Sequence, residues 1–130
     1  MRTAEEEHII QYIRLHKRLD DILTLFSEKT GMRRATACTW ILRQYTDGLI
    51  NEIPITEITP DIKNRFEIGE TYYITQGRKT DGSTLGRGMR ITMEKSLARR
   101  IDLISLQSGV PVGNLRCAMT AEYFHSIGML

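Results

Sequence analysis

Two short segments of the chain carry hydrogen-bonding side chains at alternating positions. In the first, Tyr12 and Arg14 alternate with residues of a more apolar set, and in the second Arg90 and Thr92 do so. The guanidinium fork of arginine matches the O6 and N7 acceptors of guanine, and a good bidentate pair discriminates against the wrong base by about 1–3 kcal/mol. Arg14 and Arg90 are therefore candidate base-reading residues, and Tyr12 and Thr92 could add a hydroxyl contact or touch a thymine methyl group.

The alternation predicts which face of each segment is exposed, because neighbouring side chains of a β-strand point to opposite faces. The apolar sets are expected to face the core, and they are Gln11, Ile13 and Leu15, and Met89, Ile91 and Met93. The outward sets are then Ile10, Tyr12 and Arg14, and Gly88, Arg90 and Thr92. A shift of one residue would exchange the two faces. The competing interpretation is that the outward side chains are only the solvated side of a surface hairpin.

Both segments belong to a repeat with an offset of 78 residues. When Gly31 is aligned with Gly109, residues 9–50 match residues 87–128 without a gap, and seven of the 42 positions are identical. In both copies the alternation gives way to helical spacing, which stops at the glycine, where a left-handed conformation can end a helix. A second helical stripe follows in each copy. Its members are Cys38, Ile41, Leu42, Tyr45 and Leu49 in the first copy and Val112, Leu115, Met119, Tyr123 and Ile127 in the second.

The sequence thus predicts repeat 1 over residues 8–50, a linker over residues 51–87 and repeat 2 over residues 88–130. The linker is too long to be structureless in a compact protein. A helix is expected from the cap Thr59 and the following Pro60, with Ile62 and Phe66 on one face and Gly69 at its end. Residues 71–75 have the composition of a strand, and the glycine-rich run 77–88 is expected to be mobile. Trp40, beside the stripe of its helix, is expected to pack or to form a dimer contact.

Strand, helix, glycine turn and helix in about 42 residues resemble the ribbon-helix-helix family, the Arc and MetJ superfamily of repressors. The tandem arrangement is similar to the TraY-type relaxosome proteins of conjugative plasmids and to the VirC2-type proteins of tumour-inducing plasmids. The resemblance implies a mainly α fold of the α+β class, with a short two-stranded antiparallel ribbon. One chain would supply both halves, as an intramolecular pseudo-dimer that forms one domain.

The resemblance also implies how such a fold binds double-stranded DNA. The ribbon would enter the major groove, and backbone N–H groups at the start of each second helix would hold a phosphate. The candidate backbone contacts are Arg33, Arg34, Arg78, Lys79 and Arg87. Arg33 and Pro111 stand where the family often has a serine or threonine cap, and this departure from the family pattern weakens the case for a cap-mediated contact. The basic residues before the second strand could equally form a solvated loop.

The charge distribution agrees with such a partner. The formal net charge is only +2, but residues 71–100 hold seven basic residues against two acidic ones, and residues 47–70 hold six acidic residues against two basic ones. A clustered basic stretch is typical of a phosphate-contacting surface, although it is often only a solvated face. No membrane span is expected, since the apolar runs are a few residues long.

Enzymatic and metal chemistry are not expected. His8, His16 and His125 lack metal-ligand spacing, and no nucleophile motif or phosphate loop is present. Cys38 and Cys117 have no paired spacing, which favours small core residues in a reducing, cytoplasmic setting. No cofactor is predicted.

Two functional interpretations remain open from the residues alone. The first is sequence-specific DNA binding, as a transcriptional repressor or a conjugation accessory factor, with a possible relaxase or other protein at the same site and possible side-by-side self-association on DNA. The second is a protein-interaction module, such as an antitoxin-like protein or a nickase-recruiting adaptor, with the acidic linker as a docking surface.

Overall fold

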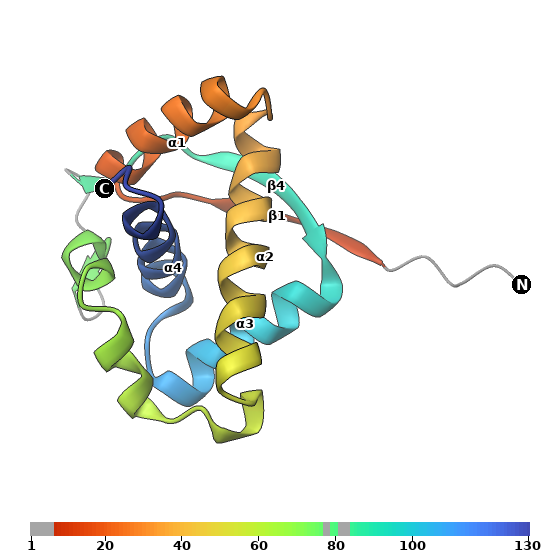
Figure 1. The fold of residues 1–130 in the computed structure, drawn as a ribbon, viewed down its shortest axis with the longest axis vertical. Helices are drawn as coiled ribbons and strands as arrows, with labels where there is room; N and C mark the ends of the chain where they lie inside the picture. Colours follow the sequence, from red (N-terminus) through yellow and green to blue (C-terminus); the bar gives the residue numbers. More distant parts are fainter. Residues whose placement is uncertain (1–6, 77–78, 81–83) are drawn as a thin grey trace, which may run out of the picture.

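A computed structural model describes residues 7–76, 79–80 and 84–130 (Figure 1). The chain is mainly helical, with a two-stranded antiparallel ribbon. The main elements are β1 (His8–Ile13), α1 (Lys17–Thr30), α2 (Arg34–Glu52), β4 (Met89–Glu94), α3 (Lys95–Ser108) and α4 (Val112–Ser126). Short 3-10 helices η1 (Ile55–Glu57), η2 (Pro60–Arg65) and η3 (Gly69–Tyr72), and a small hairpin of β2 (Thr75–Gln76) and β3 (Lys79–Thr80), lie between α2 and β4.

The ribbon pairs the two alternating segments of the sequence. β1 and β4 run antiparallel, from the pair His8–Glu94 to the pair Ile13–Met89. Ile13, Leu15, Ile91 and Met93 are buried, and Gln11 and Met89 are half-buried. The predicted inward face is therefore correct, because apolar side chains of a two-stranded ribbon gain burial only on the face that the helices cover.

Four helices cover the inward face of the ribbon (Figure 1). α1 follows β1 and α3 follows β4, so these two helices begin at opposite ends of the ribbon, and α2 and α4 pack against each other between them. α1 and α3 are each 14 residues long, and each is closed by a left-handed glycine, Gly31 with φ +75° and Gly109 with φ +76°. The hydroxyl groups of Ser27 and Ser105 donate to the carbonyls just beyond those glycines. The predicted helix ends are confirmed.

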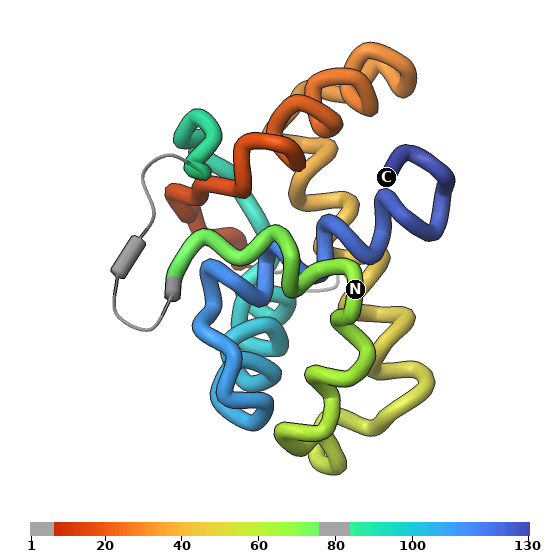
Figure 2. Tube along the Cα trace, turned by 90° about the vertical axis from the view of Figure 1, so that its left-hand side faces the viewer, coloured from red at the N-terminus to blue at the C-terminus, as the bar shows by residue number. Residues whose placement is uncertain are grey.

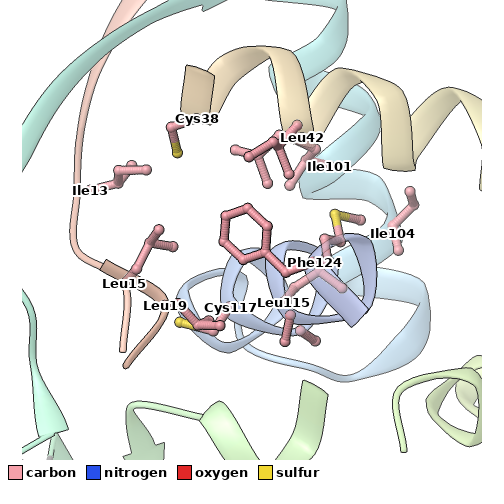
Figure 3. Close-up of a cluster of buried hydrophobic side chains, with 14 of the residues drawn as sticks. Ile13, Leu15, Leu19, Cys38, Leu42, Ile101, Ile104, Leu115, Cys117 and Phe124 are labelled. Atoms are coloured by element: carbon pink, nitrogen blue, oxygen red, sulfur yellow. The ribbon is translucent and has the colours of Figure 1, made fainter. Parts of the chain in front are cut away.

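The core lies where the helices meet under the ribbon (Figure 3). The ring of Phe124 is buried among side chains from all four helices, with Phe26 5.9 Å away between ring centroids. Cys38 and Cys117 are free and buried, as the sequence predicted. Burial raises the pKa of the Cys38 thiol to about 12 and that of Cys117 to about 11.

The linker packs against the second repeat (Figure 2). Ile58, Ile62, Phe66 and Ile74 are buried along it. Three side chains of the second repeat hold its backbone. The amide of Gln107 donates to the carbonyls of Ile55 and Ile58, the carboxylate of Glu122 accepts from the N–H groups of Ile68 and Gly69, and Asn114 bonds to Ile74 and Thr75.

Three local predictions for the linker need correction. The helix capped by Thr59 forms as a 3-10 helix, with Ile62 and Phe66 buried as expected. Gly69 does not end it but begins η3, where an added Cβ would lie 2.5 Å from the Cα of Ala118. The predicted strand over residues 71–75 is largely wrong, because the linker packs against α4 and only Thr75 joins a strand. The predicted mobility of residues 77–88 falls partly on residues 77–78 and 81–83, outside the described residues.

The stripe predicted for the second repeat is also only partly right. α4 is buried on several sides at once, since α2 covers one face and η3 another. Ile127 follows the helix and is exposed. Trp40 and Ala118 hold equivalent positions in the repeat, and they show why the buried surface of α4 differs from that of α2. Trp40 packs within the chain against Phe26 and Tyr123, whereas the small Ala118 lets the linker approach.

Candidate nucleic-acid interface

The outward face of the ribbon carries all four candidate base-reading residues. Tyr12 and Arg14 are exposed on β1 and just after it, and Arg90 and Thr92 are exposed on β4. Across the ribbon Tyr12 pairs with Arg90, and Ile10 pairs with Thr92. Ile10 is 70% exposed and Tyr12 63% exposed. The ribbon therefore presents both hydrogen-bonding and apolar groups to solvent.

The two arginines of this face are available to a ligand. No hydrogen bond or ion pair engages the guanidinium of Arg14 or of Arg90 within residues 7–76, 79–80 and 84–130. Each is a planar group with five donors that remain to be satisfied by solvent or by a partner. Arg90 lies within the six-pair ladder, and Arg14 follows its last pair, Ile13–Met89, by one residue.

The phenol of Tyr12 lies against a glycine that directly precedes the opposite strand. A Cβ added to Gly88 would lie 1.7 Å from the hydroxyl oxygen of Tyr12 and 2.2 Å from its Cζ. Gly88 is the diagonal neighbour of Tyr12 across the ribbon, a spacing that aromatic side chains can reach. The missing side chain at position 88 thus makes room for the phenol and keeps it on the ribbon surface.

At one end of the ribbon a buried carboxylate holds two arginines. Asp20, in the first turn of α1, accepts from the Nη2 of Arg34 and lies 3.7 Å from the Nε of Arg87. Its side chain is only 7% exposed, whereas that of Arg87 is 72% exposed. The chain approaches this point because Gly86 donates to the carbonyl of Leu15 at 2.8 Å. The pKa of the Arg34 guanidinium is lowered, mainly by burial and to a smaller extent by repulsion from Arg87.

The other residues predicted to contact the DNA backbone lie in three different places. Arg33 is exposed at the N-cap of α2 and forms no side-chain cap bond, and Pro111 holds the same place before α4. Lys79 lies on β3, where it pairs with Gln76 of β2. Arg78 lies outside the described residues. The Asp20 end therefore gathers Arg33, Arg34 and Arg87.

At the opposite end of the ribbon, acids neutralise the cations. Glu94 binds Arg43 of α2 at 2.5 Å, and Glu7 binds Lys95 at 3.1 Å. Burial tends to raise the pKa of Glu94, but bonds from its own backbone N–H and from Arg43 outweigh it, and the pKa is lowered. Both glutamates are thus held in their charged forms, which suits ion pairing and does not suit a neighbouring phosphate.

The inward side of the ribbon is fastened by polar contacts with α2 and α4. The hydroxyl of Thr39 donates to the carbonyl of Thr92 at 3.0 Å, and Arg116 donates to the Oε1 of Gln11 at 3.2 Å. Gln11 is the polar member of the predicted inward set on the first strand, and its amide oxygen accepts this bond from Arg116. Burial lowers the pKa of the Arg116 guanidinium.

Several residues of this surface carry little or no signal in the sequence. No local pattern shows that Asp20, an acid in the first turn of α1, will be buried between two arginines from distant segments. Lys17 and Arg18 are exposed in the first turn of α1, directly after the ribbon. Lys17 did carry a signal, because Lys95 stands at the same place in the second repeat.

Comparisons with models of protein families, with curated proteins and with solved structures found no match. No group of three or more His, Cys, Asp or Glu side chains that could hold a metal ion occurs among the described residues. Within the same residues, no helix is long and apolar enough to cross a membrane. The candidate interface therefore rests on the geometry of this chain alone.

Proposed function

We propose that the protein binds double-stranded DNA sequence-specifically by inserting the outward face of the β1–β4 ribbon into the major groove. The observation that carries the proposal is the pair of unpartnered arginines, Arg14 and Arg90, on a ribbon whose other face is buried. The major groove admits a two-stranded ribbon, and each base pair presents a distinct pattern of donors and acceptors there. Arg14 and Arg90 read guanine, and Tyr12 and Thr92 contact neighbouring bases.

The proposal includes an intramolecular pseudo-dimer of ribbon-helix-helix repeats. Tyr12 pairs with Arg90, the residue 78 places later, and the pairs Gln11–Ile91 and Ile13–Met89 exchange under the same offset. A ladder with this property has a local two-fold axis at its centre, as a ribbon between identical subunits would have. The 78-residue offset also relates the bounds of α1 to those of α3 and the first residue of α2 to that of α4. These equivalences support two repeats that form one domain around a shared core.

The two halves of the ribbon differ in sequence, so the target need not be palindromic. Around the local axis Arg14 corresponds to Thr92, and Tyr12 corresponds to Arg90. Arg14 and Thr92 have different hydrogen-bonding capacities, so the base pairs that they contact should differ. A transcriptional regulator or a conjugation accessory factor could use such a ribbon in the cytoplasm, each at its own site on the DNA.

Selection of bound duplexes from random DNA tests the proposal. Repeated selection with the whole protein should yield one preferred sequence, and the affinity for that duplex should exceed the affinity for scrambled DNA by at least about a thousandfold. The variant Arg14→Ala with Arg90→Ala should lose this preference and retain weak, salt-dependent binding. Equal affinities of the unaltered protein for the selected and the scrambled duplex would refute sequence-specific binding.

A second candidate function, a protein-interaction module, is favoured by exposed leucines on α1 and α3. Leu25 and Leu103 hold equivalent repeat positions and are both exposed, and Leu106 is 79% exposed. Leu103 and Leu106 lie one turn apart on α3, and neighbouring exposed apolar side chains of this kind can form a protein contact surface, including one for side-by-side assembly on DNA. Capture of a stoichiometric partner in the absence of DNA, lost in Leu103→Ser with Leu106→Ser, would support this function.

A further inference from the structure

The two ends of the ribbon differ in charge, although an exact repeat of the sequence would give them the same charge. The Asp20 end carries six cations, at Arg14, Lys17, Arg18, Arg33, Arg34 and Arg87, against the acids Asp20 and Asp21. The opposite end carries three cations, at Arg43, Lys95 and Arg99, against the acids Glu7 and Glu94. Two of those three cations are already bound by the two acids.

The difference arises at equivalent positions of the repeat. Arg18, Arg33 and Arg34 are replaced in the second repeat by Ser96, Pro111 and Val112. Asp20 corresponds to Ala98, so the second repeat has neither the buried carboxylate nor the arginines that it holds. No hydrogen bond or ion pair engages the side chains of Lys17, Arg18 or Arg33 within the described part of the chain.

The linker makes the first turns of α2 and α4 unequal as well. The amide oxygen of Asn114, in the first turn of α4, accepts from the N–H groups of Ile74 and Thr75 at 2.9 and 3.0 Å. Ile74 lies 3.5 Å from the place where a Cβ would stand on Gly113. Asn114 is 4% exposed, whereas its counterpart Thr36 on α2 is exposed. The linker thus runs along the start of α4 (Figure 2), whereas Arg33 and Thr36 at the start of α2 are exposed.

We infer that the protein holds the DNA backbone at one flank only, the flank beside the Asp20 end of the ribbon. This inference rests on the DNA binding proposed above and adds the direction of the grip. Arg18, Arg33 and Arg87 contact phosphates there, and Asp20 keeps Arg87 and the start of α2 in place. At the Glu94 end the paired acids and the covered helix start provide no comparable phosphate contact, so the duplex beyond that end contributes little to affinity.

Truncation of the selected duplex, combined with charge removal, tests the inference. The affinity of the whole protein is measured for the full site and for two duplexes, each shortened to the base-read core on one side. Removal of one flank should lower affinity about tenfold or more, because each lost phosphate contact also removes counterion release, and removal of the other flank should lower it by about twofold at most. The slope of log affinity against log salt should fall only with the first truncation.

Matched double variants show which end of the protein holds the sensitive flank. Arg18→Gln with Arg33→Gln removes two charges at the Asp20 end, and Lys95→Gln with Arg99→Gln removes two at the Glu94 end, largely from exposed positions. The first variant should abolish the effect of truncation, and the second should preserve it. Equal losses on both truncations, or equal effects of the two variants, would overturn the one-sided grip while leaving sequence-specific binding intact. Absence of a preferred duplex altogether would overturn the proposed function and the inference with it.

Discussion

Tyr12 and Arg90 face each other across the ribbon, and each occupies the position of the other in the repeat. The neighbouring pairs Gln11–Ile91 and Ile13–Met89 exchange under the same offset of 78 residues, so Tyr12 and Arg90 stand at the centre of this relationship. The exposed aromatic side chain of the outward face and one of its two unpartnered arginines thus lie at the same step of the ladder. Substitutions around this point should separate the stability of the ribbon from its recognition of DNA.

The first prediction concerns the packing of Tyr12 on Gly88. Gly88→Ala should displace the phenol, because the new methyl group would occupy its place, and should lower the free energy of unfolding by about 1 kcal/mol. In the background Tyr12→Ala the same substitution should cost almost nothing. Urea unfolding of the four proteins gives the coupling between the two positions. A cost of Gly88→Ala that is equal in both backgrounds would contradict the contact.

The second prediction concerns the carboxylate that holds Arg34 and Arg87. Asp20→Asn keeps the shape of the side chain but removes its charge, so the partly buried guanidinium of Arg34 loses its counter-ion. We expect the free energy of unfolding to fall by about 2 kcal/mol, the scale of a hydrogen bond between charged groups. Asp21→Asn, at the exposed neighbouring position, serves as the control and should change stability little. Equal effects would show that the buried carboxylate has no special role.

The third prediction is a loss of stability in alkaline solution. Burial raises the pKa values of Cys38 and Cys117 from the ordinary 9.0 to about 12 and about 11. Burial of the two neutral thiols contributes fully to stability below their pKa in the unfolded chain. This contribution is lost as the pH rises toward their pKa values in the folded protein, because the thiols of the unfolded chain release their protons first. The free energy of unfolding should fall by about 1.4 kcal/mol per pH unit for each thiol between about pH 9 and pH 11.

Replacement of the two thiols isolates their share of this pH dependence. Burial also raises the pKa of Tyr45, which adds to the loss in the upper part of the range. Cys38→Ala with Cys117→Ala should therefore reduce the alkaline slope without removing it. Stability is followed by urea unfolding at fixed pH values. An unchanged slope would mean that the thiols are not buried as described.

The fourth prediction is that the linker is part of the folding unit. Phe66 is fully buried, 6.3 Å from the ring of Tyr45 between centroids. Phe66→Ala should lower the free energy of unfolding by about 3–5 kcal/mol, as large truncations in cores do. Thermal unfolding followed by far-UV and near-UV circular dichroism should remain a single transition. Little loss of stability, or a separate early transition, would instead describe a linker that only tethers two repeats.

Much of the fold was predictable because it depends on local periodicity. Alternation identified the inward and outward faces of both strands, and the glycines at 31 and 109 marked the ends of α1 and α3. The linker was harder to predict. Its 3-10 turns form where Gly69 meets Ala118 and where Glu122 binds the backbone, and both contacts join residues about 50 positions apart.

The candidate interface divides in the same way. The amino-acid sequence by itself determined that Tyr12, Arg14, Arg90 and Thr92 lie on one face, because side-chain direction along a strand follows from the backbone. Only the tertiary structure decided which cations are free and which are bound. Asp20 engages Arg34 and Arg87, Glu94 engages Arg43, and the linker covers the start of α4. These choices depend on contacts between distant segments, and charge pairing acts through space and not along the chain.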